Sequence, residues 1–193
     1  MIKIGILGGI FDPVHNGHLH IADGILRKLD LSKVFMVPAG DPPHKEQSPY
    51  ASGLHRLNML NIAIAENPAF EILDIELNRP GKSFSVDTLR ELKESYPDWE
   101  LFFIIGSDNL SEILTWKNPE RIFKLANIVL VNRPGNDLPP SEIDLPGEVI
   151  ELKLPGLNIS STQIRQYIKD DVPCQYLLPP DVERYILDNS LYL

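Results

Sequence analysis

The chain has 193 residues, of which 43% are hydrophobic and 23% charged, as expected for a globular protein that can bury its own core. Its formal net charge of −9 disfavours nucleic-acid binding, which depends on clustered Lys and Arg. The single cysteine, Cys174, excludes a disulfide within the chain, and no apolar run is long enough to cross a membrane. We therefore expect a cytoplasmic protein without a nucleic-acid or membrane partner.

Short apolar runs alternate along the chain with stretches of helical period. The runs predict strands at 2–7, 33–37, 70–77, 101–105, 128–131 and 149–154. Helical spacing and capping residues predict helices at about 17–29 and 54–64, from Ser85 through Leu92, from Asn118 to Leu125, and after Ser160 and Pro179. This alternation predicts an α/β fold, a Rossmann-like, doubly wound, mostly parallel sheet with helices on both faces. We expect one domain over residues 1–193, with ligands bound where the strands end.

The loop after the first predicted strand has the composition of an anion-binding site. Gly8-Gly9 lies between a strand and a helix, where glycine permits a tight turn and the helix start offers free N–H groups. His15 and His18 are three residues apart at that helix start, so both can face the same way. Three interpretations stay open: a zinc site, which lacks a third ligand nearby, a structural pair, or two hydrogen-bond donors to phosphate.

A second candidate phosphate site lies near the other end of the chain. Ser160-Ser161-Thr162 predicts a helix start, and Arg165 follows one helical turn later. A capped helix with a surface arginine would explain this pattern equally well. The alternative is a second helix N-terminus whose amides and hydroxyls meet phosphate beside a permanent positive charge.

Both segments resemble motifs of one superfamily. His15-Asn16-Gly17-His18 resembles the (H/T)-x-G-H signature of the nucleotidylyltransferases, and the segment from Ile159 to Arg165 resembles their I-S-S-T-x-I-R element. The wider run from Gly8 to His18 is similar to the bacterial nicotinate-mononucleotide adenylyltransferases, although Ile10 replaces their usual threonine. Further resemblances to that family are Pro42-Pro43-His44-Lys45, Ser83 to Leu89, Gly106-Ser107-Asp108, Trp116 and Arg133-Pro134-Gly135.

The resemblance implies the nucleotidylyltransferase fold and the transfer of AMP from ATP to nicotinate mononucleotide in NAD biosynthesis, giving deamido-NAD and pyrophosphate. It implies catalytic roles for His15, His18 and Arg165, with the helical part at about 158–193 completing the ATP site. The residues implied to bind ATP are Gly8, Gly9, Ile10, Phe11, His15, His18, Gly106, Asp108, Ile159, Ser160, Ser161, Thr162 and Arg165. Those implied to bind the mononucleotide are Asp12, His44, Lys45, Ser83, Phe84, Ser85, Trp116 and Arg133.

No carboxylate set typical of a metal site stands out in the sequence, so we expect Mg²⁺ to accompany ATP, held mainly by phosphate oxygens and water. Two rival functions remain: another superfamily activity, such as pantetheine-phosphate adenylyl or cytidylyl transfer, and a non-catalytic nucleotide-binding module. The sequence leaves the oligomeric state open, including a homo-oligomer. It also leaves open the preference for the nicotinate over the nicotinamide mononucleotide, which depends on backbone geometry around Ser85 and Trp116.

Overall fold

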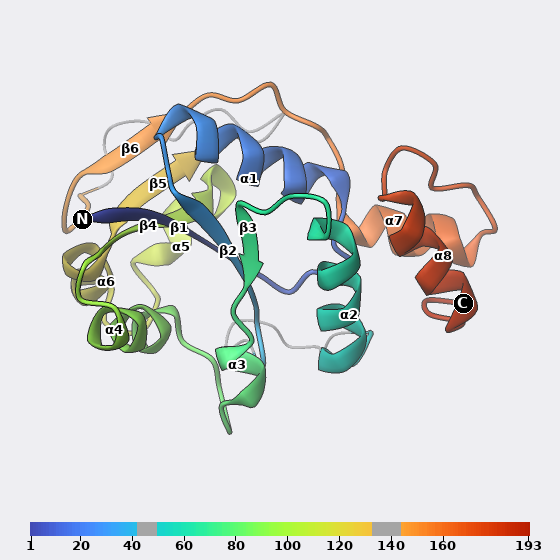
Figure 1. Cartoon of the computed structure of the whole chain (residues 1–193), viewed down its shortest axis with the longest axis horizontal. Coiled ribbons are helices and arrows are strands. Elements are labelled where there is room, and N and C mark those ends of the chain that lie inside the picture. Colours follow the sequence, from blue (N-terminus) through green and yellow to red (C-terminus); the bar gives the residue numbers. More distant parts are fainter. Residues whose placement is uncertain (42–49, 133–143) are drawn as a thin grey trace.

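A parallel β-sheet forms the centre of the computed structural model, which describes residues 1–41, 50–132 and 144–193 (Figure 1). Within these residues the sheet has six strands in the order β3-β2-β1-β4-β5-β6, and every neighbouring pair is parallel. The strands are β1 (Ile2–Gly9), β2 (Lys33–Pro38), β3 (Phe70–Ile72), β4 (Trp99–Gly106), β5 (Asn127–Val131) and β6 (Val149–Leu152). The predicted fold class is confirmed.

Helices connect the successive strands from β1 to β5 and close the chain. They are α1 (Asn16–Lys28), α2 (Gly53–Ile64), α3 (Ile75–Asn78), α4 (Ser85–Ser95), α5 (Leu110–Ile113), α6 (Pro119–Leu125), α7 (Ser161–Lys169) and α8 (Pro180–Asp188), with a 3₁₀ turn η1 (Ser107–Asn109) before α5. In Figure 1, α7 and α8 stand together at one side of the molecule, beside α2.

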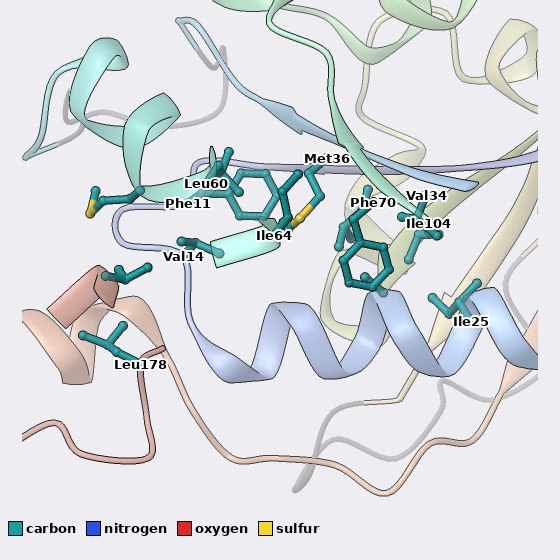
Figure 2. Close-up of a cluster of buried hydrophobic side chains, with 14 of the residues drawn as sticks. Phe11, Val14, Ile25, Val34, Met36, Leu60, Ile64, Phe70, Ile104 and Leu178 are labelled. Atoms are coloured by element: carbon teal, nitrogen blue, oxygen red, sulfur yellow. The ribbon is translucent and has the colours of Figure 1, made fainter. Parts of the chain in front are cut away.

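Alternation along the strands divides the core into two layers, because successive strand residues point to opposite faces. On one face, Val34, Met36 and Ile104 pack with buried residues of α1, α2, α7 and α8 (Figure 2). On the other face, Ile6 and Phe103 pack with buried residues of α4, α5 and α6. Near-continuous apolar runs in β1, β2 and β4 follow from burial on both faces.

Cys174 belongs to the first of these layers. It is 2% exposed, and burial raises the pKa of its thiol, so it behaves as a small hydrophobic residue. Among the described residues, no helix is both long and apolar enough to cross a membrane.

The third and the sixth strand end earlier than predicted. The strand predicted at 70–77 ends at Ile72, because the chain turns after the Leu73 N–H reaches the Met36 carbonyl at 3.1 Å and then forms α3. The strand predicted at 149–154 ends at Leu152. Beyond it, the Leu154 N–H leaves the ladder and donates to Asn132 Oδ1 at 2.8 Å.

The N-caps of two helices, α4 and α6, have features that were not predicted. Helix α4 has Phe84 rather than Ser85 at the N-cap, with extended backbone (φ −113°, ψ 130°). The Asp87 N–H donates to the Phe84 carbonyl at 3.0 Å, which is the bond of a first helical turn. The predicted Asn118 cap of α6 is confirmed, but Asn118 sits in the left-handed region (φ 51°) and its side chain makes no capping hydrogen bond.

The sheet has a topological switch point between β1 and β4, because the chain adds strands first on one side of β1 and then on the other. From β1 the chain first builds outward through β2 and β3, and it then crosses to β4 on the other side of β1. In open α/β sheets, ligands bind outside the carboxyl ends of the strands at such a switch point. The loops that leave β1 and β4 are therefore expected to border the ligand site.

Candidate active site

A cavity of about 860 Å³ opens at this switch point. It is lined by the ends of β1 and β4, by the start of α1, by the start of α4 and by the start of α7. Most of the predicted site residues that the structure describes line this cavity: Gly8, Gly9, Ile10, Phe11, Asp12, His15, His18, Ser83, Phe84, Ser85, Gly106, Trp116, Ile159, Ser160, Ser161, Thr162 and Arg165. The predicted His44, Lys45 and Arg133, and the side chain of Asp108, lie outside the described residues.

The first loop is shaped by close packing around one aromatic ring. Phe11 is buried and adopts a left-handed backbone (φ 53°). A Cβ atom at Gly9 would come within 2.9 Å of that ring, so position 9 needs glycine for a close approach. The Phe11 ring also meets His18 edge-on, with centroids 5.0 Å apart. The loop therefore packs directly against the start of α1.

The two predicted histidines form a stacked pair at the start of α1. Their ring centroids are 3.7 Å apart and the planes differ by 21°. His15 is the N-cap residue, and its backbone N–H donates to His18 Nδ1 at 3.3 Å. An Nδ1 atom that accepts a hydrogen bond leaves the proton of a neutral ring on Nε2. His18 thus has a hydrogen-bond donor at Nε2 in a ring that lines the cavity.

Ile10, the departure from the family pattern, contributes through its backbone. Its carbonyl accepts a hydrogen bond from Arg56 Nη1 at 2.8 Å. Arg56 is only 2% exposed, and burial lowers the pKa of its guanidinium, while the nearby Asp12 charge opposes that change. Arg56 was not predicted, because an arginine in a helix usually lies on the surface.

Asp12 is buried and accepts three hydrogen bonds from the protein. Its Oδ2 atom accepts from the Tyr50 N–H at 2.7 Å. Its Oδ1 atom accepts from the Ala51 N–H at 3.0 Å and from the Tyr192 hydroxyl at 2.7 Å. Burial and the neighbouring carboxylate raise the pKa of Tyr192, so this residue stays a hydroxyl donor. Tyr50 and Tyr192 are far from Asp12 in sequence, and neither was predicted.

The second candidate phosphate segment contacts the first loop directly. Ser160 is the N-cap of α7, and its Oγ accepts from the Gln163 N–H at 3.2 Å. The Ser161 hydroxyl donates to the Pro13 carbonyl at 2.9 Å. The Arg165 Nη1 donates to the Asp12 carbonyl at 2.7 Å. Two motifs about 150 residues apart in sequence thus share one wall of the cavity.

Arg165 is held in one orientation by further contacts. Its Nη2 donates to Thr162 Oγ1 at 3.2 Å, and its guanidinium lies over the Tyr50 ring, 4.4 Å from the centroid. Stacking on an aromatic face together with bonds at both terminal nitrogens restricts the guanidinium to one orientation. The cavity is therefore lined by a positive group with a fixed orientation.

The other end of the cavity is lined by aromatic side chains and by the start of α4. Phe84 and Trp116 both line it, and the Trp116 ring meets Phe103 edge-on at 6.2 Å. Ser83 is buried, and its N–H donates to the Asp41 carbonyl at 2.8 Å. The first backbone N–H groups of α4 lie at the N-terminus of the helix, where the helix dipole favours negative charge.

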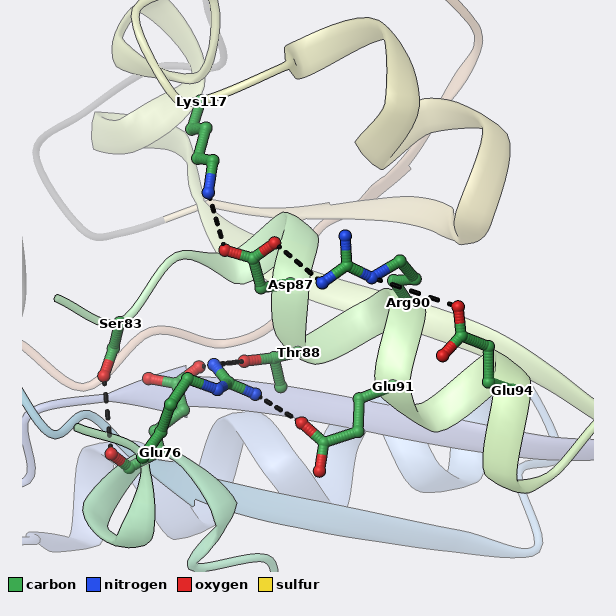
Figure 3. Close-up of polar contacts among 9 residues, drawn as sticks. Glu76, Ser83, Asp87, Thr88, Arg90, Glu91, Glu94 and Lys117 are labelled. Carbon is green, nitrogen blue, oxygen red and sulfur yellow. Dashed lines mark hydrogen bonds and ion pairs between the residues drawn. The ribbon is translucent and has the colours of Figure 1, made fainter. Parts of the chain in front are cut away.

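A buried polar network fixes α4 at this end (Figure 3). Glu76 is 9% exposed and accepts from the Thr88 hydroxyl at 2.6 Å. Arg79 joins it by donating to Thr88 Oγ1 at 3.1 Å and to Glu91 at 2.6 Å. Burial raises the pKa of Glu76, and the Thr88 hydrogen bond partly opposes this. Glu76 also lines the cavity and was not predicted, because it lay within the segment assigned to a strand.

The described residues contain no group of side chains suited to hold a metal ion. No set of three or more His, Cys, Asp or Glu side chains there is placed to hold a metal ion.

Comparisons with known proteins agree on one family. The family model for cytidylyltransferase-like proteins matches residues 6–167. The chain is 40% identical to the probable nicotinate-nucleotide adenylyltransferase of Symbiobacterium thermophilum, a match covering 100% of this chain and 96% of the relative. It is 38% identical to the nicotinate-nucleotide adenylyltransferase of Bacillus subtilis, over 100% of this chain and 99% of the relative.

A solved structure has the same fold. The Plasmodium falciparum nicotinic acid mononucleotide adenylyltransferase complexed with NaAD superposes with a TM-score of 0.85 at 22% identity, covering 100% of this chain and 98% of that one. At 22% identity, this similarity shows the fold alone. The family model and the full-length relatives carry the assignment further: this chain belongs to the cytidylyltransferase-like family and, within it, to the nicotinate-nucleotide adenylyltransferases.

Proposed function

We propose that this enzyme transfers AMP from ATP to nicotinate mononucleotide, releasing pyrophosphate and forming deamido-NAD. The observation that carries the proposal is the contact between the two phosphate motifs. Arg165 and Ser161 donate to the carbonyls of Asp12 and Pro13, so the first loop and the start of α7 surround one cavity at the sheet switch point. The names of the full-length relatives support the choice of nicotinate mononucleotide as the acceptor.

In the proposed reaction an oxygen of the mononucleotide phosphate attacks the α-phosphorus of ATP. A new P–O bond forms, the bond from the α-phosphorus to the α–β bridging oxygen breaks, and pyrophosphate leaves with that electron pair. The attacking phosphate is already an anion near neutral pH, so the step needs no general base. Catalysis then rests on positioning the two phosphates and on neutralising charge as it develops.

His18, His15 and Arg165 are the proposed catalytic residues. The Nε2–H of His18 and the N-terminus of α1 would donate to the triphosphate, and Arg165 would meet the phosphates from the start of α7. The remaining proposed ATP contacts are Gly8 to Phe11, Gly106, Asp108 and Ile159 to Thr162, so that the segment from about 158 completes the ATP site. Asp12 fits a positioning role, since its carbonyl holds Arg165 and its carboxylate is held by three donors.

The mononucleotide would lie at the other end of the cavity. Trp116 offers an aromatic surface for the pyridine ring, and Phe84, Ser83 and Ser85 line the same end. The N-terminus of α4 favours the negatively charged nicotinate carboxylate over the neutral amide. Roles for His44, Lys45 and Arg133 in binding the mononucleotide stay predictions.

Three further expectations belong to this proposal. Mg²⁺ would enter with ATP as the MgATP substrate, held by phosphate oxygens and water. A cytoplasmic location suits an enzyme whose one thiol, Cys174, is buried and unmodified by any disulfide. A homo-oligomeric state remains compatible with the proposal and does not enter the mechanism.

The test supplies ATP and Mg²⁺ with nicotinate mononucleotide, nicotinamide mononucleotide or phosphopantetheine, and measures pyrophosphate release and the nucleotide product. The proposal expects deamido-NAD and pyrophosphate in equal amounts, with the highest kcat/KM for nicotinate mononucleotide. A higher kcat/KM for phosphopantetheine, or ATP binding without pyrophosphate release from any acceptor, would refute it.

A further inference from the structure

Lys117 joins the two aromatic segments at the mononucleotide end of the cavity. It follows Trp116 directly and lines the cavity with it. Its ammonium lies over the Phe84 ring, 4.4 Å from the centroid, and donates to Asp87 Oδ2 at 2.8 Å in the first turn of α4 (Figure 3). A lysine on a surface loop usually extends into solvent, whereas this one reaches from the segment after Trp116 to Phe84 and to the first turn of α4.

The Asp87 carboxylate does not cancel the charge of Lys117, because a second cation shares it. Arg90 Nη2 lies 3.2 Å from Asp87 Oδ1, and Figure 3 shows Lys117 and Arg90 approaching this carboxylate from different sides. Arg90 also lies 4.0 Å from Glu94, on the exposed side of α4. Of the two cations, only Lys117 lines the cavity. The mononucleotide end thus carries a positive charge that also lies over the Phe84 ring, so its position does not depend on Asp87 alone.

We infer that Lys117 is a specificity-determining residue that favours an acidic pyridine mononucleotide over its neutral amide. This inference rests on the proposed function. The physical reason is the difference in charge between the two acceptors, since a nearby cation attracts the carboxylate and has little effect on the amide. The N-terminus of α4 acts in the same direction, and Lys117 adds a full charge beside it.

The experiment compares kcat/KM for nicotinate and nicotinamide mononucleotide in the wild type and in Lys117→Met, which keeps the length of the side chain and removes its charge. We expect the ratio of the two values to fall about fivefold, the scale of a partly exposed charge interaction. The fall should come from a higher KM for nicotinate mononucleotide, with KM for ATP changed by less than about twofold. Lys117→Arg, which restores the charge, should recover most of the ratio.

Two matched variants separate charge from structure. Arg90→Met removes the other partner of Asp87, and it should leave the ratio within about twofold of the wild type. Asp87→Asn removes the carboxylate and keeps Lys117, so the ratio should not fall. An unchanged ratio in Lys117→Met, or an equal fall in Lys117→Met and Asp87→Asn, would overturn the inference. A wild type that turns over neither mononucleotide would instead refute the proposed function.

Discussion

The buried Asp12 carboxylate gives a sharp prediction about stability. Replacing Asp12 by Asn keeps the size and shape of the side chain but exchanges one acceptor oxygen for an NH₂ donor. The two oxygens now serve different partners, the Tyr50 N–H on one side and the Ala51 N–H with the Tyr192 hydroxyl on the other. An asparagine in either orientation must therefore point its NH₂ at a backbone N–H.

The expected loss follows from these contacts. One charge-assisted hydrogen bond is lost, a partly buried donor then faces another donor, and Arg56 loses the neighbouring anion that offsets its burial. Each such bond to a charged group is worth about 1.5–3 kcal/mol, and an unsatisfied buried donor costs a similar amount. We expect Asp12→Asn to lower the free energy of unfolding by about 3 kcal/mol.

Urea denaturation followed by circular dichroism measures this change. Asp23→Asn is the matched control, because Asp23 forms an exposed i,i+4 ion pair with Arg27 at 3.0 Å. The control should lose no more than about 0.5 kcal/mol. If Asp12→Asn lost as little as the control, the three hydrogen bonds assigned to the carboxylate would not be the reason for its burial.

Three further predictions concern catalysis and pH. His18→Ala should lower kcat by a factor of about 100 or more, and near-normal turnover with an unchanged circular-dichroism spectrum would remove His18 from the mechanism. Arg165→Lys keeps the charge but replaces the two nitrogens that bond the Asp12 carbonyl and Thr162 separately by a single ammonium, so kcat/KM should fall about tenfold or more in steady-state kinetics. Equal activity would contradict the orienting role of these bonds. Glu76 has a raised pKa, so the stability of the wild type relative to Glu76→Gln should be greatest below pH 4.5, the ordinary value, and fall as pH rises through the raised pKa. Urea titrations across pH would show this trend, and a difference that grew with pH would contradict it.

The parts of the site that depend on local sequence could be predicted. Gly9, His15 and His18 lie within ten residues of one another, so strand, turn and helix start are all visible in the pattern. The same holds for Ser160 and Arg165, whose spacing specifies a capped helix with a cation one turn along. The parallel sheet was predictable because its strands are buried on both faces and read as continuous apolar runs.

The residues that hold these motifs together could not be predicted, because their contacts are set by the tertiary fold. Tyr192 meets Asp12 across 180 positions in the chain, and no local pattern indicates that pairing. Glu76 was not predicted for a different reason. The segment from Phe70 to Leu77 has the apolar content of a strand, yet the register with β2 extends only from Phe70 to Ile72. The remainder was free to form α3.

The central claim is that the first loop and the start of α7 form one site for adenylyl transfer to a pyridine mononucleotide. A single-turnover reaction with ATP labelled in its α-phosphate, excess enzyme and nicotinate mononucleotide tests it most directly. The account predicts that all of the label appears in deamido-NAD and none in pyrophosphate, and that His18→Ala and Arg165→Lys each slow this step. Label that stays in ATP, or that appears as free AMP without the acceptor, would contradict it.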